Sequence, residues 1–277
     1  MIVTKPIFIL ASGRSGTYSI YKSLKREKRI ESHHEFYFEK TLRNSVLYYL
    51  KKKKKKELIK FINSKHGLSI KKSNKKYWVD SSNALPWITD VLYENFPNAK
   101  FVHLVRNGKK VVSSFYYKLK DIMYNKRDII KLYNYLNSNR SSIPNKKKYW
   151  RPIPHKSKKD FNYFLKAGQF YRICCYWRDV NKNIRKHLNK VPKKNKLTFN
   201  FENIEKEKKI FELFNFLGIP KKRYRNVLKK FKKPINVRTP KNFYLTKKQL
   251  NIFDKVCGKE MIQNGYLKGT KEYEVIY

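Results

Sequence analysis

Residues 7–19 read IFILASGRSGTYS, and this stretch decides the fold class of the chain. The apolar run at residues 7–11 is short and continuous, as in a parallel strand that is buried on both faces. It ends at a polar turn, and apolar residues at helical spacing follow, with Thr17 in position to cap a helix. A buried strand that leads through a turn into an amphipathic helix predicts an α/β protein with a central parallel sheet.

The turn at residues 12–16 has the composition of an anion-binding loop. Gly13 and Gly16 let the backbone fold around an anion with several N–H groups pointing inward, and the next helix adds its positive dipole end. Arg14 brings a permanent guanidinium to the same space, suited to an oxyanion. An ordinary tight turn would contain the same two glycines, so the rest of the chain has to support this interpretation.

This turn matches neither of the two common nucleotide-binding motifs. A Walker loop has Lys directly before the Ser or Thr, whereas Gly16 precedes Thr17, and the third glycine of the dinucleotide motif is missing. The motif SGRSGT resembles the 5′-phosphosulfate loop of sulfotransferases, which are P-loop-like α/β enzymes. This resemblance implies that the donor nucleotide contacts Ser12, Gly13, Arg14, Ser15, Gly16, Thr17 and Tyr18.

A second segment, KFVHLVRNGKKVVSSFYY at residues 100–117, supports the same assignment. A buried-strand pattern ends at Arg106, the turn Asn107-Gly108 follows, and a helix with an apolar stripe begins. Arg106 and Ser114, eight residues apart, resemble the 3′-phosphate motif of sulfotransferases. A plain strand–turn–helix unit could also contain Arg-Asn-Gly, but two matching motifs in the family's order make chance a weaker explanation.

Other segments resemble the framework of the same family. Residues 177–181 resemble a W-x-x-x-N helix, and LTFNFENI at 197–204 resembles a late strand and its turn. The implied fold is a three-layer α/β/α arrangement around a central parallel sheet, as one domain over residues 1–277. Residues 41–76 predict a basic segment of helix or loop, and residues 118–165 predict an insertion that serves as a lid over the acceptor.

Further elements are expected between these motifs. Residues 29–40, RIESHHEFYFEK, are interpreted as a segment that leads out of the first helix. Strands are expected at 77–80, 101–105 and 196–201, and helices at 88–96, 204–217 and 246–264.

The resemblance implies sulfuryl transfer from 3′-phosphoadenosine-5′-phosphosulfate (PAPS) to an acceptor hydroxyl. Negative charge then grows on the bridging oxygen of the leaving phosphate, where a cation and backbone N–H groups stabilise the transition state more than the ground state. Arg14 is the candidate for this electrostatic role, because an arginine does not give up its proton. The chemistry needs no metal, and no cluster of metal-ligating residues stands out in the sequence.

The acceptor hydroxyl needs a general base, for which several residues are candidates. Glu35 leads, because carbohydrate and glycolipid sulfotransferases often place a carboxylate just after the first helix; the same resemblance favours such acceptors. His34 is the rival and His33 a further candidate, since another branch of the family uses a histidine. Asp80, at the end of an expected strand, is predicted either to bind the acceptor or to cap a helix. His103 lies mid-strand and is expected to be a packed core residue.

The chain is strongly basic, with 67 Lys and Arg against 20 Asp and Glu and a formal net charge of +47. Such a protein can bind polyanions without specificity, so a nucleic-acid-binding protein is the non-enzyme alternative. However, the lysines are spread along the chain, with dense runs such as 51–56, and no known motif arranges the tyrosines for base stacking. The bias towards Lys, Asn, Ile and Tyr is typical of an AT-rich genome, and most of the charge is interpreted as solvated surface. A P-loop kinase is the alternative enzyme, although its loop lysine is missing.

The sequence also bears on the compartment. There is no signal-peptide pattern, and no apolar run approaches the ~20 residues that span a bilayer. The three cysteines form neither a disulfide framework nor a zinc pattern, and they are expected to be free thiols in a reducing compartment. The cytoplasm is therefore the expected location.

Overall fold

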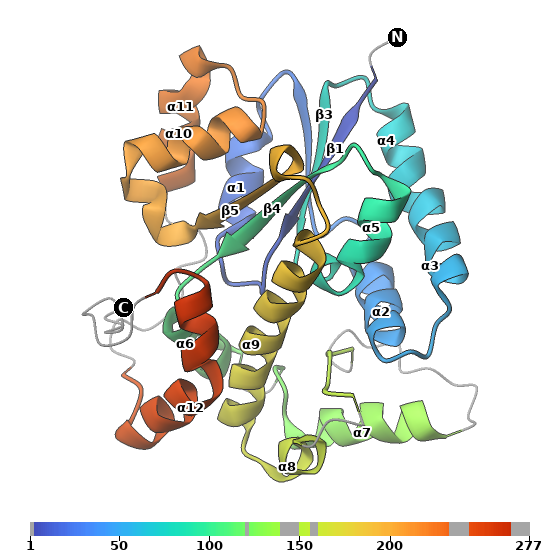
Figure 1. Ribbon diagram of the computed structural model, residues 1–277, viewed down its shortest axis with the longest axis vertical. Coiled ribbons are helices and arrows are strands. Elements are labelled where there is room, and N and C mark those ends of the chain that lie inside the picture. The colour runs from blue at the N-terminus through green and yellow to red at the C-terminus, as the bar shows by residue number, and fades with distance from the viewer. Residues whose placement is uncertain (1–2, 120–121, 139–149, 156–159, 233–243, 267–277) are drawn as a thin grey trace.

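A computed structural model describes residues 3–119, 122–138, 150–155, 160–232 and 244–266 of the chain (Figure 1). Its centre is a five-stranded sheet in the order β2-β3-β1-β4-β5, in which every neighbouring pair of strands is parallel. The strands are β1 (Lys5–Leu10), β2 (Ile30–His34), β3 (Tyr77–Ser82), β4 (Lys100–Val105) and β5 (Lys196–Asn200).

The central strand β1 is apolar on both sides, which places the core above and below the sheet. Ile7 and Ile9 belong to one buried cluster, whereas Phe8 and Leu10 belong to another. Successive side chains of a strand point to opposite faces, so a continuous apolar run buries both faces at once.

Helices cover both faces of the sheet (Figure 1). The side of Ile7 and Ile9 is covered by α1 (Thr17–Leu24), α10 (Glu207–Phe216) and α11 (Tyr224–Lys232). The cluster around Phe8 and Leu10 draws on α2 (Phe38–Tyr49), α3 (Lys55–Ile62), α4 (Leu68–Lys72), α5 (Thr89–Asn95), α6 (Gly108–Lys118), α7 (Lys126–Asn137), α8 (Phe161–Lys166), α9 (Gln169–Leu188) and α12 (Lys247–Gln263). The predicted three-layer α/β fold with a central parallel sheet is confirmed.

Short turns of helix connect these elements. A π-helical turn, Asn63–Gly67, lies between α3 and α4, and a 3₁₀ turn, Leu85–Ile88, precedes α5. Other 3₁₀ turns in the described part of the chain are Lys193–Asn195, Phe201–Glu205 and Lys221–Arg223.

The two segments without family resemblance both contribute to this arrangement. Residues 41–76 are largely helical and comprise most of α2 together with α3, the π-helical turn and α4. Within residues 118–165, Met123, Tyr124 and Trp150 are at most 2% exposed and belong to the core. Parts of this second segment lie outside the described residues.

Two local predictions are wrong. Residues 29–40 were expected only to leave the first helix, but they contain β2, which pairs with β3 at the edge of the sheet. Thr17 was expected to cap α1, but it is the first helical residue; Gly16 is the N-cap, with a left-handed φ of 94° and no side-chain cap. Gly16 can adopt this conformation because it has no Cβ.

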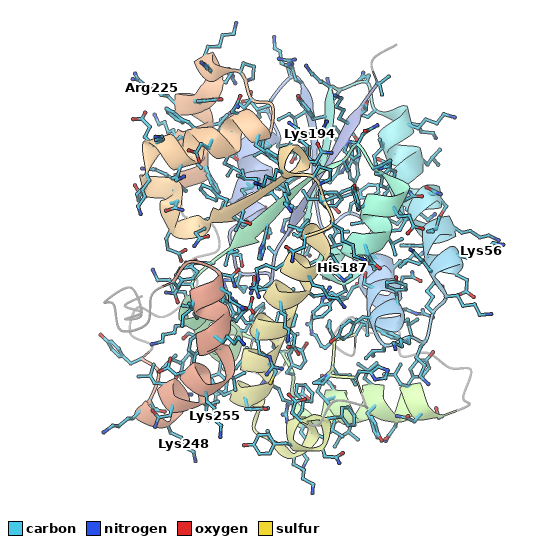
Figure 2. All side chains as sticks on the ribbon, viewed as in Figure 1. Lys56, His187, Lys194, Arg225, Lys248 and Lys255 are labelled. Carbon is cyan, nitrogen blue, oxygen red and sulfur yellow. The ribbon has the colours of Figure 1, made fainter. Side chains whose placement is uncertain are left out.

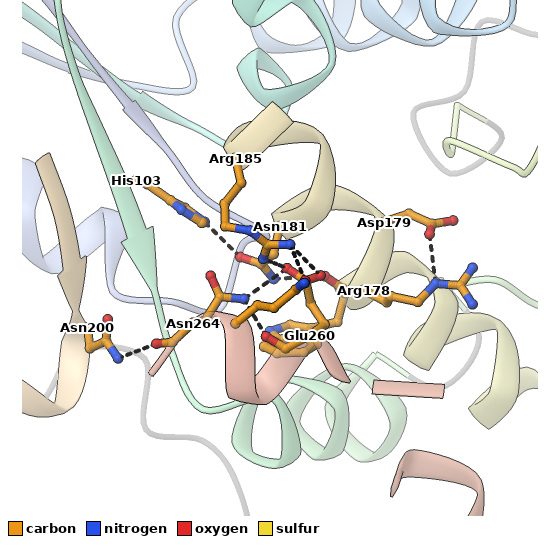
Figure 3. A network of polar contacts seen from close by, with 10 residues as sticks. His103, Arg178, Asp179, Asn181, Arg185, Asn200, Glu260 and Asn264 are labelled. Carbon is orange, nitrogen blue, oxygen red and sulfur yellow. Dashed lines mark hydrogen bonds and ion pairs between the residues drawn. The ribbon is translucent and has the colours of Figure 1, made fainter. Parts of the chain in front are cut away.

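A buried polar network joins the sheet to the helices below it (Figure 3). His103 on β4 is fully buried, as expected, and its Nε2 lies 2.9 Å from Asn181 Oδ1 on α9. Arg185 on α9 pairs with Glu260 on α12, whose Oε1 also accepts a hydrogen bond from Asn264. We call these five residues the helix-packing network. Burial lowers the pKa of His103 to about 4, against a partly opposing effect of the hydrogen bond with Asn181, so this histidine is neutral at pH 7.

Basic side chains are distributed over the surface rather than gathered on one face. Figure 2 shows Lys56, Arg225 and Lys248 extending outward from different sides of the molecule. This distribution agrees with the interpretation of most of the charge as solvated surface. In the part of the chain that the structure describes, no helix is both long and apolar enough to cross a membrane.

Candidate active site

The turn after β1 has a backbone that its glycines make possible. Gly13, Arg14 and Gly16 all have positive φ values, of 78°, 55° and 94°. A Cβ built on Gly16 would lie 2.2 Å from the ring of Phe201, so no other residue fits there without displacing that ring. The first glycine packs against a different neighbour, since a Cβ on Gly13 would lie 3.0 Å from Asn83 Nδ2.

The same turn is held in shape by its own hydroxyls and by α9. Ser12 Oγ and Ser15 Oγ lie 2.9 Å apart, and each donates to the carbonyl oxygen of Gly13 at 3.1 Å. Tyr176 on α9 donates its hydroxyl to the carbonyl oxygen of Ser12 at 2.6 Å. Because α1 has no side-chain cap, the N–H groups of its first turn can hydrogen-bond an anion.

The two phosphate motifs predicted from the sequence meet in space. Arg14 Nε donates to Ser114 Oγ at 2.9 Å, and Arg106 Nη1 donates to the carbonyl oxygen of Arg14 at 3.0 Å. The guanidinium of Arg106 also lies 5.1 Å from the ring centroid of Phe201. Its Nε is buried and has no hydrogen-bond partner among the described residues. We call Arg14, Arg106 and Ser114 the donor cluster.

The turn after β4 is fixed by a carboxylate from the turn after β5. Glu202 Oε1 accepts a hydrogen bond from the backbone N–H of Asn107 at 3.0 Å, and Glu202 Oε2 accepts one from the hydroxyl of Tyr266 at 2.6 Å. The side chain of Asn107 in turn caps α6 by accepting from the N–H of Lys109. This chain of contacts holds the backbone directly after Arg106.

Glu35 lies beside the turn after β1. Its Oε1 accepts a hydrogen bond from Asn83 Nδ2 at 3.2 Å, and Asn83 is the side chain that packs against Gly13. Burial raises the pKa of Tyr176, Arg151 opposes the rise, and the negative charge of Glu35 adds to it. Glu35 is therefore close enough to influence the tyrosine that supports Ser12.

The two histidines next to Glu35 have different surroundings. His34 Nε2 lies 3.2 Å from Thr17 Oγ1, and its ring stands edge-on to Tyr18, with centroids 5.3 Å apart. His33 points to the other side of the sheet, where its Nε2 lies 2.9 Å from Glu31 Oε1 and its ring contacts Trp78. His34 thus packs on the first turn of α1, while His33 lies away from that turn.

Asp80 does neither of the two things expected of it. It lies within β3, which extends to Ser82, and its side chain is 0% exposed. Its Oδ1 accepts a hydrogen bond from the backbone N–H of Phe36 at 3.2 Å. Because the carboxylate is buried and bound to that amide, it neither caps a helix nor reaches an acceptor.

Comparisons with known proteins identify the family. The model of the sulfotransferase family matches residues 6–163, which include both motifs of the donor cluster. The chain belongs to the sulfotransferase family. A search of curated protein sequences found no match to this sulfotransferase.

Solved structures of sulfotransferases share the fold over almost the whole chain. A sulfotransferase from Alicyclobacillus acidocaldarius is 10% identical with a TM-score of 0.51, and the match covers 96% of this chain and 98% of that one. The sulfotransferase STF9 from Mycobacterium avium is also 10% identical, with a TM-score of 0.52 and coverage of 96% and 78%. A sulfotransferase domain from the curacin biosynthetic pathway is 14% identical, with a TM-score of 0.50 and coverage of 96% and 99%.

The protein is therefore a sulfotransferase enzyme, and the alternative of a P-loop kinase is excluded.

Sequence reasoning missed several residues that shape the candidate site of this sulfotransferase. The polar run that follows Val79 could have pointed to Asn83, because side chains at the carboxyl end of a parallel strand gather at one edge of a sheet. Tyr176, Phe201 and Glu202 gave no comparable signal, since their roles depend on neighbours that are distant in sequence. Among the described residues, no group of three or more His, Cys, Asp or Glu could hold a metal ion.

Proposed function

We propose that the protein transfers the sulfuryl group of PAPS to a hydroxyl of a carbohydrate, glycolipid or similar acceptor. The observation that carries this proposal is the donor cluster, in which two hydrogen bonds join Arg14 to residues 92 and 100 positions further along the chain. Each motif alone could belong to an ordinary turn. Their direct contact forms one basic site, which supports binding of a nucleotide that has phosphates at both its 5′ and 3′ positions.

The donor site fits such a nucleotide in its backbone as well as in its charges. The N–H groups at the start of α1 and the guanidinium of Arg14 would hold the 5′-phosphosulfate. Arg106 and Ser114 would hold the 3′-phosphate, and the buried Nε of Arg106 without a partner is a donor available to it. The absence of a Cβ at Gly16 lets the ring of Phe201 pack directly against the backbone of this turn.

In the proposed reaction, the acceptor oxygen forms a bond to sulfur while the bond from sulfur to the bridging oxygen breaks. Arg14 and the N–H groups of residues 15–17 stabilise the charge that develops on the bridging oxygen. Glu35 takes the proton of the acceptor hydroxyl, from a position beside the turn that holds the sulfuryl group. His34 is the alternative base, and its contact with Thr17 places it next to the same helix end.

The remaining expectations form part of the same proposal. The whole chain would act as one catalytic domain, with residues 118–165 as an acceptor lid beside the site. All three cysteines are buried and free, which supports a reducing compartment such as the cytoplasm. Binding of other polyanions would be non-specific and lost at high salt.

A thermal-shift titration tests the donor assignment without knowledge of the acceptor. Adenosine 3′,5′-bisphosphate, the product nucleotide, should raise the melting temperature without magnesium, because a ligand of the folded state stabilises it. Adenosine 5′-monophosphate should give a much smaller shift at the same concentration. Equal shifts, or a requirement for ATP and magnesium, would contradict the proposal.

Acceptor class is tested by the rate of radiolabel transfer from PAPS to a small panel. The panel contains octyl β-D-glucopyranoside as a glycolipid mimic, a methyl glycoside and para-nitrophenol. Faster transfer to the sugars supports a carbohydrate or glycolipid acceptor, whereas faster transfer to the phenol contradicts it.

A further inference from the structure

We propose that Asp80 and His66 form a buried pair that positions the turn carrying Glu35, and thereby affects sulfuryl transfer without touching a substrate. Both are positioning residues in this proposal. The inference rests on the proposed role of Glu35 as the general base. Neither Asp80 nor His66 takes part in the proposed transfer reaction itself.

Asp80 is an acidic side chain in the interior of a parallel sheet. It lies opposite Phe8 of β1 and opposite His33 of β2 in the register of the sheet, and it is 0% exposed. Burying a carboxylate costs free energy unless other groups compensate for the lost water, and an apolar residue would pack here without that cost. The position of Asp80 therefore indicates a role other than packing.

One carboxylate oxygen of Asp80 tethers the turn between β2 and α2. Asp80 Oδ1 accepts a hydrogen bond from the N–H of Phe36 at 3.2 Å, and Ser81 O accepts one from the N–H of Glu35 at 3.1 Å. Glu35 and Tyr37 both have left-handed backbones, with φ values of 56° and 49°. Residues other than glycine are strained in this region, so the turn depends on contacts that hold it.

The other carboxylate oxygen faces a histidine. Asp80 Oδ2 lies 3.7 Å from His66 Nε2, both side chains are fully buried, and neither atom has a hydrogen-bond partner within the described residues. His66 belongs to the π-helical turn between α3 and α4. Such turns insert an extra residue into a helix and are frequent at functional sites. Here the inserted turn carries the histidine that faces the buried carboxylate.

The same histidine also packs against the turn. The rings of His66 and Phe36 are 5.3 Å apart and nearly perpendicular, at 75°. Phe36 is therefore held through its N–H by Asp80, and its ring packs on His66 together with His33 and Trp78. Because Glu35 directly precedes Phe36, these contacts fix the backbone from which the carboxylate of Glu35 reaches Asn83.

A double-mutant cycle tests whether Asp80 acts through Glu35. The turnover number is measured with PAPS and the best acceptor of the panel, starting with octyl β-D-glucopyranoside, for Asp80→Ala with and without Glu35→Gln. We expect Asp80→Ala to lower kcat by ~10- to 100-fold when Glu35 is present and by less than about twofold in the Glu35→Gln background. Affinity for adenosine 3′,5′-bisphosphate should change by less than about threefold, which also shows that the variant is folded.

Conservative variants keep the test decisive if Asp80→Ala does not fold. Asp80→Asn retains an oxygen that can accept from Phe36 N–H, so it should recover most of the turnover number. His66→Gln should lower kcat when Glu35 is present but not in the Glu35→Gln background. His103→Gln is the matched control, since it alters another buried histidine, and its effect on kcat should not depend on Glu35.

The outcomes separate this inference from the proposed function. If Glu35→Gln by itself leaves kcat unchanged, Glu35 is not the base and the inference is wrong, whereas the proposed function is wrong only if the unmodified protein transfers no sulfuryl group from PAPS to the sugar acceptors. If Glu35→Gln removes activity but Asp80 and His66 variants lose the same factor in both backgrounds, only the inference is wrong. A loss of donor affinity in step with the loss of kcat would also overturn it, because it would indicate general damage to the fold.

Discussion

The donor cluster and the helix-packing network both contain arginines, but these arginines contact different kinds of groups. In the helix-packing network, Arg185 meets Glu260, with Nη2 and Oε2 3.0 Å apart. In the donor cluster, Arg14 and Arg106 are brought together, and the hydrogen bonds that join them go to a hydroxyl and a carbonyl oxygen. The first arrangement pairs opposite charges, whereas the second places two positive charges side by side.

This difference indicates what each region is for. The pairing of Arg185 with the buried Glu260 is a structural contact, since the protein supplies both charges. Two arginines at the end of a parallel sheet raise the local positive potential, which an anionic ligand lowers when it binds. Changes in the donor cluster and at Glu35 should therefore alter binding and turnover, and changes in the helix-packing network should alter stability.

The largest effect is expected at Glu35, the carboxylate beside the donor cluster. Glu35→Gln keeps the size of the side chain but cannot take a proton, so kcat should fall by ~10²- to 10⁴-fold with donor affinity intact. Steady-state transfer rates and a binding titration measure the two quantities. Glu31→Gln, on β2 just before the turn that carries Glu35, is the matched control and should have little effect. If His34→Asn abolishes transfer and Glu35→Gln does not, the histidine is the base.

Arg14 should matter more to turnover than to donor affinity. Its charge is needed where the bridging oxygen becomes negative, so Arg14→Ala should lower kcat by ~10²- to 10³-fold with a smaller change in donor Kd. Arg14→Lys keeps the charge but loses the planar fork and should be intermediate. Near-normal turnover of Arg14→Ala would remove this residue from the mechanism.

Arg106 should determine affinity for the 3′-phosphate. Arg106→Ala should weaken binding of adenosine 3′,5′-bisphosphate by ~2–4 kcal/mol and barely change binding of adenosine 5′-monophosphate, as measured by calorimetry. Arg225→Ala, which removes an exposed arginine from α11, is the matched control. Equal losses for both nucleotides would contradict the assignment to the 3′-phosphate.

The free energy of unfolding should depend on pH through His103, a member of the helix-packing network. The pKa of His103 is about 4 in the folded protein, below its ordinary value of 6.5, so the unfolded chain binds more protons between these pH values. The contribution of His103 is complete above pH 6.5 and decreases as the pH falls, by roughly 2 kcal/mol at pH 5. Urea denaturation at pH 7.5 and pH 5 measures this change. His103→Gln should show a smaller loss of stability than the original protein over the same interval, and an identical loss would contradict the role of His103.

Strands with continuous apolar runs could be predicted from the sequence, but the edge strand could not. β1 and β4 are buried on both faces and read as apolar runs. β2, Ile30–His34, has one apolar residue and only partly buried side chains after it, so its pairing with β3 rather than its composition makes it a strand. The same pairing explains the error at Asp80, whose polarity predicted a strand end although the strand continues to Ser82.

The candidate site could be predicted where a local motif carries the information. Arg14, Arg106 and Ser114 were expected at one site, and the structure brings them within hydrogen-bond distance. Asn83, Tyr176 and their contacts with the turn after β1 depend on how distant segments pack. No spacing rule in the sequence encodes such contacts, because they arise only when the sheet order is known.

Phe201 links the beginning of the chain to a segment made much later during synthesis. Its ring is both the wall next to Gly16 and the surface under Arg106. A ribosome that has translated the turn at residues 12–16 must add most of the chain before residue 201 can emerge. The nascent protein therefore lacks the complete candidate site until β5 has docked. If the proposed donor assignment holds, capture by an immobilised adenosine bisphosphate would report the completion of folding on the ribosome rather than its onset.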